Sequence, residues 1–306
     1  MNVNDEIFRL VKGEKSLSEI SRSTSLSNRD VYKNILNMQR KGYVIDSKIL
    51  DSGDIKYFTS SKEKIHNNTV DLSLVDSSKF KALVIADTHI GSITQRLEYL
   101  DIVYEFAHNN DIHIIINAGD LIDGNFGPLD KFIPEITDQL DFVIKNHPYS
   151  EDILNLICLG NHDYSAFDDY IDIRKVLTYY REDLIPIGFG ISIINILNDQ
   201  IIVKHPINDL NLKNVKSNLA LCGHTHKMAA NFSENGLEVF IPALCNMQFN
   251  DDLPGFVKMN LSLKDGSFIH GHFDSYAICN SIFKASEIDT DFPTSIEGKT
   301  LIKQKI

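Results

Sequence analysis

Five short apolar segments in this sequence each run directly into Asp, His or Asn, and this pattern limits the possible folds more than any other feature. Residues 83–86 lead into Asp87 and His89, and residues 114–118 lead into Asp120. Short apolar strands that alternate with amphipathic helices are typical of an α/β layered fold with parallel strands. Because ligands bind at the carboxyl ends of such strands, we expect the five blocks to meet at one place.

Three further blocks complete the series. They are Gly160-Asn161-His162-Asp163 after residues 156–159, His205 after residues 201–204, and Gly223-His224-Thr225-His226 after residues 219–222. Asp and His are ligands for borderline divalent metals, and an Asn carbonyl can join them. Two metal ions about 3.5–4 Å apart can bind a phosphate from both sides and activate a shared water. No reactive serine or cysteine setting is apparent, so water or hydroxide is the expected nucleophile.

The ordered series Asp-x-His, Gly-Asp, Gly-Asn-His-Asp, His, Gly-His-x-His resembles the calcineurin-like metallophosphoesterase superfamily over about residues 79–275. This resemblance implies a two-sheet sandwich flanked by helices, with two divalent metal ions, commonly Mn²⁺, Fe or Zn²⁺. It implies His162 as a catalytic histidine that binds no metal, with Asp163 orienting its imidazole or its loop. The implied ligands are Asp87, His89, Asp120 and His226 for the first metal, and Asp120, Asn161, His205 and His224 for the second.

Other side chains near these blocks receive weaker interpretations. We expect Asp123 to support its loop and not to bind metal. The pair His270 and His272 has the spacing of a ligand pair but comes too late in the order of the blocks. We therefore expect both to be structural or surface residues. His113 and His147 fit no block either. Three aromatic side chains of the expected rim loops could stack on a base or pack in the core: Phe126, Tyr164 and Phe167.

Residues 1–60 show a different pattern, three short helices followed by a hairpin. Ile7 and Val11 stand at helical spacing, Ser16 and Glu19 fit a capping box, and Ser27 opens the third helix. Strands are expected at 43–50 and 55–59, around a turn at 51–54.

This order resembles a winged helix-turn-helix domain, which implies that the third helix enters the DNA major groove. Binding of protein, or dimerisation, is the open alternative for such a domain. The polar face of the third helix carries Arg29, Lys33, Asn34, Asn37 and Arg40.

The net charge differs in sign between two parts of the chain. The net charge is −12, but residues 1–62 hold 11 Lys and Arg against 8 Asp and Glu, whereas the remainder holds 19 against 34. A basic small domain beside an acidic large one suggests two tasks. We expect a winged-helix-like domain at 1–60, a linker at 61–78, a metallophosphoesterase domain at 79–280 and a peripheral C-terminal segment at 281–306.

Within the large region, helices are expected at 96–108, 129–146 and 166–181. Strands are expected at 82–86, 112–118, 153–159, 191–197, 200–204 and 219–222, with strands lacking helices at 236–242 and 256–272. In the second helix the expected buried stripe is Phe132, Ile133, Ile136, Leu140 and Val143.

The blocks narrow the reaction. The protein Ser/Thr phosphatases of this superfamily carry an Arg after the second block and Glu at the end of the third, where this chain has no Arg and has Asp163. We therefore expect a two-metal phosphodiesterase of the nuclease type, resembling the Mre11 and SbcD branch, with nucleic acid as partner. The alternatives are a phosphodiesterase acting on a small cyclic nucleotide or similar diester, and a DNA-binding regulator without catalysis.

The remaining features concern location and assembly. No apolar run reaches the length of a membrane span, and residues 1–12 resemble no secretory signal. The four cysteines form no CxxC pair and are interpreted as reduced, which fits the cytoplasm. Dimers occur in the superfamily that the chain resembles, so a homodimer stays open, although no coiled-coil heptads are present.

Overall fold

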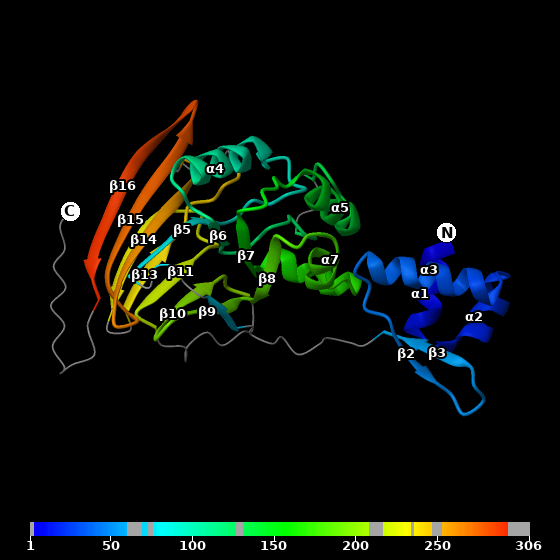
Figure 1. The fold of residues 1–306 in the computed structure, drawn as a ribbon. Helices are drawn as coiled ribbons and strands as arrows, with labels where there is room; N and C mark the ends of the chain where they lie inside the picture. Colours follow the sequence, from blue (N-terminus) through cyan, green and yellow to red (C-terminus); the bar gives the residue numbers. More distant parts are fainter. Residues whose placement is uncertain are drawn as a thin grey trace.

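The computed structural model describes residues 3–59, 69–72, 76, 78–126, 131–207, 217–233, 236–246 and 253–292 of the chain. These residues form a small N-terminal lobe and a larger mixed α/β body (Figure 1). Within these ranges, no helix has both the length and the apolar character needed to cross a bilayer.

The N-terminal lobe consists of three helices and an antiparallel sheet of order β1-β3-β2. Its elements are α1 (Val3–Lys12), β1 (Lys15–Ser16), α2 (Leu17–Thr24), α3 (Asn28–Arg40), β2 (Asp46–Ile49) and β3 (Ile55–Phe58). The three predicted helices and the hairpin are confirmed. The two-residue strand β1 was not predicted, and the first hairpin strand begins at Asp46, three residues later than expected.

Local signals explain the helices of the lobe. The Ser16 hydroxyl accepts a hydrogen bond from the Glu19 backbone N–H at 3.3 Å, and the Glu19 carboxylate accepts one from the Ser16 N–H at 2.8 Å. Such a capping box satisfies amides that a helix start leaves unpaired. The buried face of each helix follows the 3.6-residue period and builds one apolar core. That core contains Ile7, Val11, Ile20, Val31, Ile35, Met38, Ile45 and Tyr57.

The larger body contains two sheets. The seven-stranded sheet has the order β16-β15-β14-β5-β6-β7-β8, and its strands are β5 (Lys79–Ile85), β6 (Ile114–Asn117), β7 (Leu154–Leu159), β8 (Leu184–Phe189), β14 (Gly255–Lys264), β15 (Ser267–Cys279) and β16 (Ser281–Asp291). The six-stranded sheet has the order β12-β13-β11-β10-β9-β4, and its strands are β4 (Thr69–Leu72), β9 (Ile191–Ile196), β10 (Asp199–Lys204), β11 (Leu219–Cys222), β12 (Ala229–Ser233) and β13 (Gly236–Phe240). The predicted α/β class is confirmed.

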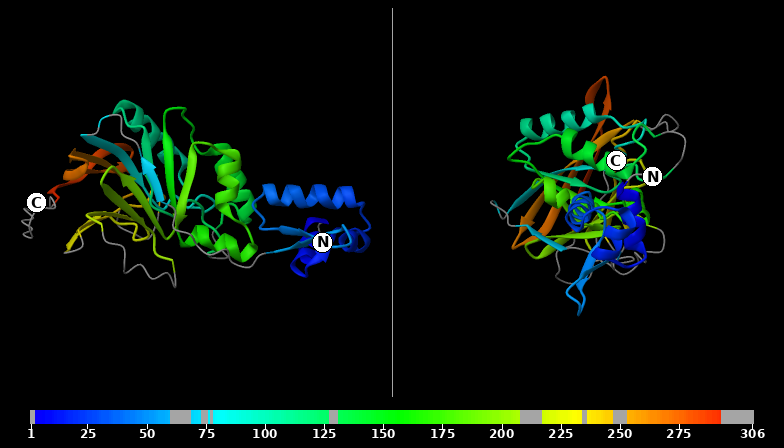
Figure 2. Two further views of the ribbon diagram at one scale, coloured as in Figure 1. Left: turned by 60° about the horizontal axis from the view of Figure 1, so that its bottom comes forward. Right: turned by 90° about the vertical axis from the view of Figure 1, so that its right-hand side faces the viewer.

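Alternation along the strands assigns each face of the seven-stranded sheet to its own core. In β5, Ala82 and Val84 face the six-stranded sheet and share a core with Ile194 and Val203. Leu83 of the same strand belongs to the other core, together with residues of the helices. These helices cover the opposite face of the sheet (Figure 2). Those helices are α4 (Leu97–Asn109), α5 (Ile136–Asn146) and α7 (Ile173–Tyr180).

Strands β5, β6, β7 and β8 pair in parallel, and β10 pairs in parallel with β11. Their carboxyl ends therefore point to one edge of each sheet. A one-turn helix, α6 (Asn161–Tyr164), and a 3₁₀ turn, η1 (Ser165–Asp169), follow β7 at that edge.

The structure corrects several expectations about the elements. The helix expected at 129–146 begins only at Ile136, Phe132 is 62% exposed, and Ile133 precedes the helix, so neither belongs to a helical buried stripe. Residues 69–72, expected in a linker, form β4 beside β9. Strands β8 and β12 were not predicted.

The C-terminal expectation also changes. Residues 281–291, expected to be peripheral, form the edge strand β16, and residues 293–306 lie outside the described residues. Edge strands that are exposed on most of their length carry little apolar signal, which explains the miss.

Candidate metal centre

The five predicted blocks meet at one place. Each block follows the carboxyl end of a strand, namely β5, β6, β7, β10 and β11. The blocks come from both sheets, so the centre lies where the two sheets' carboxyl edges face each other. The structure brings together all seven side chains predicted as metal ligands: Asp87, His89, Asp120, Asn161, His205, His224 and His226.

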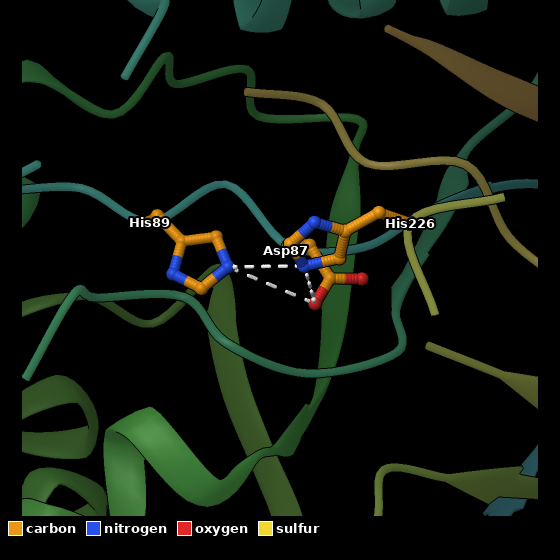
Figure 3. A group of neighbouring side chains, drawn as sticks. All are labelled: Asp87, His89 and His226. Atoms are coloured by element: carbon orange, nitrogen blue, oxygen red, sulfur yellow. Dashed lines mark hydrogen bonds and ion pairs between the residues drawn. The ribbon is translucent and has the colours of Figure 1, made fainter. Parts of the chain in front are cut away.

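A first group joins Asp87, His89 and His226 (Figure 3). The Nε2 atoms of the two imidazoles lie 3.4 Å apart. The Oδ1 atom of Asp87 lies 3.2 Å from Nε2 of His226 and 3.8 Å from Nε2 of His89. Three potential ligand atoms thus point at one another, from strand ends far apart in the sequence.

A second group joins Asp120, His205, His224 and Asn161. The Nε2 atom of His205 lies 3.0 Å from Oδ2 of Asp120 and 3.2 Å from Oδ1 of Asn161. The Nδ1 atom of His224 lies 3.1 Å from the same Asn161 oxygen. Oδ2 of Asp120 also lies 3.8 Å from Nε2 of His89, so this carboxylate stands between the two groups.

The donor set fits a divalent cation. Imidazole nitrogens, carboxylate oxygens and an amide oxygen are the ligands that Mn²⁺, Fe²⁺ and Zn²⁺ accept. His205 donates its Nδ1–H to the Ala118 carbonyl at 2.7 Å, which leaves the Nε2 lone pair of the neutral ring facing Asp120. Protein metal sites commonly orient a ligand imidazole in this way.

Two buried polar atoms that lack a hydrogen-bond partner in the described part of the chain also fit a bound cation at this place. The Oδ1 atom of Asp87 and the Nδ1 atom of His89 are buried without a hydrogen bond to any described residue. Burial lowers the pKa of His205, but the negative charge of Asp120 outweighs it and raises that pKa to about 9. A pocket that holds a proton this strongly attracts positive charge, and a metal cation competes for the same lone pair.

Backbone strain is concentrated in these blocks. Asp87, His89, Asp120, His224 and His226 all adopt left-handed backbone conformations, with φ between 44° and 75°. Each such residue costs of order 1 kcal/mol and persists only where the surroundings hold it, commonly at functional sites.

Close approach of the strands explains one glycine in the blocks. Gly119 has a φ of 112°, and a Cβ atom there would overlap the imidazole of His205.

His162 lies beside the two groups and, with His89 and Asp123, forms a third set of side chains that could hold a metal ion. Its Nδ1–H donates to the Asp123 carbonyl at 2.7 Å, so Nε2 faces the centre, 4.0 Å from Oδ2 of Asp120. Its backbone N–H donates to Oδ1 of Asp120 at 2.9 Å. Burial lowers the pKa of the His162 imidazole, against the opposing charge of Asp120.

The Asp163 side chain makes different contacts from the His162 side chain. Its buried carboxylate accepts hydrogen bonds from the backbone N–H groups of Gly160, Leu121 and Ile122 at 2.8–3.1 Å. Burial, followed by the charge of Asp120, raises the pKa of Asp163. Of the two roles implied for this residue, the contacts match support of the loop, because the imidazole of His162 is held by a backbone carbonyl instead.

Asp123 approaches the centre more closely than the sequence indicated. Its Oδ1 atom lies 3.6 Å from Nδ1 of His89 and 3.8 Å from Nδ1 of His162. The spacing Gly-Asp-Leu-Ile-Asp was the available signal, since Asp120 and Asp123 are three residues apart in the chain.

Among the rim aromatics, Phe126 alone has an exposed ring. It lies 4.5 Å from the His162 ring at an interplanar angle of 34° and is 47% exposed. Tyr164 and Phe167 instead pack on Phe189 in the core.

Two histidines outside the blocks, His270 and His272, lie on β15. His270 and His272 pair with Asp289 on the edge strand β16, each at 3.0 Å. His272, Asp274 and Glu287 also form a group with metal-type ligands, but Lys284 contacts both of these carboxylates.

Several solved structures of low sequence identity align with this chain. An archaeal phosphodiesterase is 13% identical and aligns over 65% of this chain and 100% of its own, with a TM-score of 0.41. Vacuolar protein sorting 29 from Cryptosporidium parvum is 14% identical over 71% of this chain and 100% of its own, with a TM-score of 0.42. The phosphoesterase Yfce from E. coli is 16% identical over 63% and 98%, with a TM-score of 0.38.

No curated protein matches this chain. Residues 80–228 match the family described as Calcineurin-like phosphoesterase, and this range contains all five blocks of the candidate metal centre. Residues 80–228 of this chain therefore form a calcineurin-like phosphoesterase domain.

Proposed function

We propose that this protein is a two-metal phosphodiesterase that hydrolyses phosphodiester bonds in nucleic acid. One observation carries the proposal: two groups of metal-type ligands, with Asp120 between them, converge from five separate strand ends beside His162, which belongs to neither of these two groups. Two adjacent divalent sites next to a proton donor are the arrangement that phosphate ester hydrolysis needs.

The proposed ligand sets follow the two groups. The amide oxygen of Asn161 contacts only the second group, whereas Asp120 approaches both, so Asp120 is the bridge. Bound there, divalent ions, for which we propose Mn²⁺ with Fe or Zn²⁺ as alternatives, would offset phosphate charge and lower the pKa of a water. The first set is Asp87, His89, Asp120 and His226; the second is Asp120, Asn161, His205 and His224.

His162 is the proposed proton donor. Because Nδ1 is committed to the Asp123 carbonyl, the Nε2 atom is the one that faces the centre. A protonated Nε2 can donate to the oxygen that leaves the phosphorus atom, a role worth about 10²- to 10⁴-fold in rate. Asp163 holds the loop on which His162 stands, through its three backbone hydrogen bonds.

Cysteine nucleophiles do not fit this centre. Burial raises the pKa values of Cys158, Cys222 and Cys245 to about 12, so each thiol stays protonated near neutral pH. Cys279 is exposed, but it lies on β15, which is separated from β7 in the seven-stranded sheet by β14, β5 and β6. Water is therefore the proposed nucleophile.

The proposed substrate class rests on the N-terminal lobe. Its element order of helix, strand, two helices and a hairpin supports a winged helix-turn-helix domain at residues 1–60, with residues 61–78 leading to the phosphoesterase region. Helix α3 exposes the cations Arg29, Lys33 and Arg40 and the neutral amide of Asn37, which are all suited to phosphate contacts. A basic lobe would hold a polyanion that the acidic body repels.

The exposed ring of Phe126 adds a second point in favour of nucleic acid. A large apolar side chain that is 47% exposed at the rim of a polar centre offers a planar surface. Stacking of a base on an aromatic ring is worth about 1–3 kcal/mol and tolerates any sequence.

The decisive experiment measures hydrolysis of bis(p-nitrophenyl) phosphate and of single- and double-stranded DNA with Mn²⁺. Wild type, His162→Ala and the surface variant His113→Ala are compared. We expect both substrates to be cleaved by wild type and by His113→Ala, and the rate to fall by about 10²-fold or more in His162→Ala, because the proton donor is lost.

Other outcomes separate the alternatives. Hydrolysis of the model diester with DNA left intact would move the substrate to a small phosphodiester, such as a cyclic nucleotide, and the N-terminal lobe to a regulatory task. Metal binding without hydrolysis of any diester would leave a DNA-binding regulator on a metal-stabilised scaffold.

A further inference from the structure

The N-terminal lobe is joined to the phosphoesterase region by a strand-like contact. Residues 42–44, after α3, run antiparallel to residues 170–172, after η1, with a bridge between Tyr43 and Ile171. The Val44 N–H donates to the Tyr170 carbonyl at 2.6 Å, and the Asp172 N–H donates to the Gly42 carbonyl at 2.8 Å. Figure 1 shows this junction where α3 approaches α7.

Side chains close the junction around Tyr170. The Phe8 ring of α1 lies edge-on to the rings of Tyr43 and Tyr170, with centroids 4.8 and 5.6 Å away. The Nζ atom of Lys12 lies 4.4 Å from the Tyr170 ring centroid, within range of a cation–π contact. The Tyr170 ring therefore packs against the N-terminal lobe, although the Tyr170 backbone is part of the phosphoesterase region.

The two surfaces approach too closely for a loose association. Gly42 has a φ of 92°, and a Cβ atom there would overlap the side chains of Val176 and Ile171. Packing this tight, with two backbone hydrogen bonds, fixes the position of residues 170–172.

The same short segment holds His162 at its other end. The Ser165 hydroxyl donates to the His162 carbonyl at 2.6 Å and accepts from the Asn125 N–H at 2.8 Å. The Ile171 N–H donates to the Ala166 carbonyl at 2.9 Å, and Tyr170 ends the turn in a left-handed conformation with φ of 61°. The segment from α6 through η1 to Ile171 is thus held by its own hydrogen bonds, with the proposed proton donor at one end and the lobe at the other.

We infer that Tyr170 is a positioning residue for His162, and that the N-terminal lobe sets the turnover number of the phosphoesterase centre through it. The inference rests on the proposed function, in which His162 transfers the proton. The segment α6–η1 transmits the position of the lobe because it is short and internally hydrogen-bonded. A nucleic acid that moves the lobe on binding would act on kcat by the same path.

The expected signature is a loss of kcat at constant KM. Displacement of a catalytic group by about 1 Å can lower the rate about 100-fold. The substrate keeps its contacts with the other groups of the site, so KM should not change. Six of the seven proposed metal ligands lie outside the segment α6–η1, and the seventh, Asn161, also contacts His205 and His224.

The test uses the full chain with Mn²⁺ and bis(p-nitrophenyl) phosphate, a substrate too small to need the lobe for binding. Tyr170→Ala should lower kcat by about 10-fold or more with KM and metal content unchanged, because His162 is displaced but not removed. Tyr170→Phe keeps the ring and should restore wild-type kcat. The matched control is Tyr179→Ala, which removes a 60% exposed tyrosine of α7 outside the junction.

A second variant places the change in the lobe itself. Phe8→Ala should lower kcat in the same way, and the double variant Phe8→Ala, Tyr170→Ala should lose no more than Tyr170→Ala alone, since both remove one contact. If Tyr170→Ala does not fold, the Phe8→Ala variant still tests the inference.

Unchanged kcat in Tyr170→Ala or in Phe8→Ala, with wild type active and His162→Ala inactive, would overturn this inference and leave the proposed function standing. Absence of metal-dependent hydrolysis by wild type would overturn both.

Discussion

The N-terminal lobe and the phosphoesterase region bury different kinds of residue. Among the described residues of the lobe, Ser16 is the only buried polar side chain, and the core is aliphatic except for Tyr57. The phosphoesterase region buries Asp87, His89, Asp120 and His205 almost completely. A buried charge costs several kcal/mol unless it is paired, so this region gives up stability at its centre.

The difference extends to the backbone. The non-glycine left-handed residues of the lobe, Glu14 and Ser25, end helices α1 and α2, where such conformations are common. In the phosphoesterase region five of the seven proposed ligands adopt them. Local rules therefore explain the lobe, whereas the centre is held in a strained state by tertiary contacts.

The largest effect that would test this contrast is on metal binding. Asp120→Asn removes the charge of the proposed bridge, so affinity for Mn²⁺ should fall by more than about 100-fold, beyond the loss of an outer hydrogen-bond partner. Metal content after dialysis against a defined Mn²⁺ concentration measures it. Asp289→Asn, which also loses a carboxylate paired with histidines but on β16, is the control and should keep both metals. Unchanged metal content in Asp120→Asn would contradict the ligand scheme.

A core change in the lobe should act on stability and spare the metals. Ile35→Ala deletes a fully buried side chain of α3 and should cost about 2–5 kcal/mol, because a cavity remains in an apolar core. Hydrogen exchange should accelerate in α1 to α3 while β5 to β7 stay protected. Faster exchange in β5 to β7, or loss of metal, would show that the two regions do not differ as described.

The smallest effect concerns pH and belongs to the phosphoesterase region. Burial lowers the pKa of His147 to about 4, so the folded state holds this imidazole neutral where the unfolded chain, with a pKa near 6.5, binds a proton. The stability contributed is present above about pH 6.5 and is lost as pH falls toward 4.

Between pH 7.5 and 5 this group should account for about 2 kcal/mol of lost unfolding free energy. Urea unfolding of wild type and His147→Gln at both pH values measures it, with His113→Gln as an exposed control. An equal pH dependence in wild type and His147→Gln would refute the assignment.

Prediction from sequence succeeded where one residue's neighbours in the chain decide the outcome. The helices of the lobe follow from Ser16, Glu19 and the 3.6-residue spacing of apolar residues. It failed where tertiary packing decides: Phe132 is apolar yet exposed, and residues 69–72, expected in a linker, pair with β9. Edge strands such as β4 and β16 gain their stability from a neighbouring strand that no local pattern reveals.

The sequence by itself determined which chemical groups the centre holds, since the order and residue types of the five blocks already supply carboxylates and imidazoles that could bind a metal ion. Only the tertiary structure decided which atoms face one another. The Nε2 atom of His162 faces the centre because a backbone carbonyl binds Nδ1, and Asp163 supports a loop because three backbone N–H groups surround it. The physical reason is distance along the chain: residue identity sets what a side chain can bind, but contacts from residues 39–42 positions away set the direction of these two side chains.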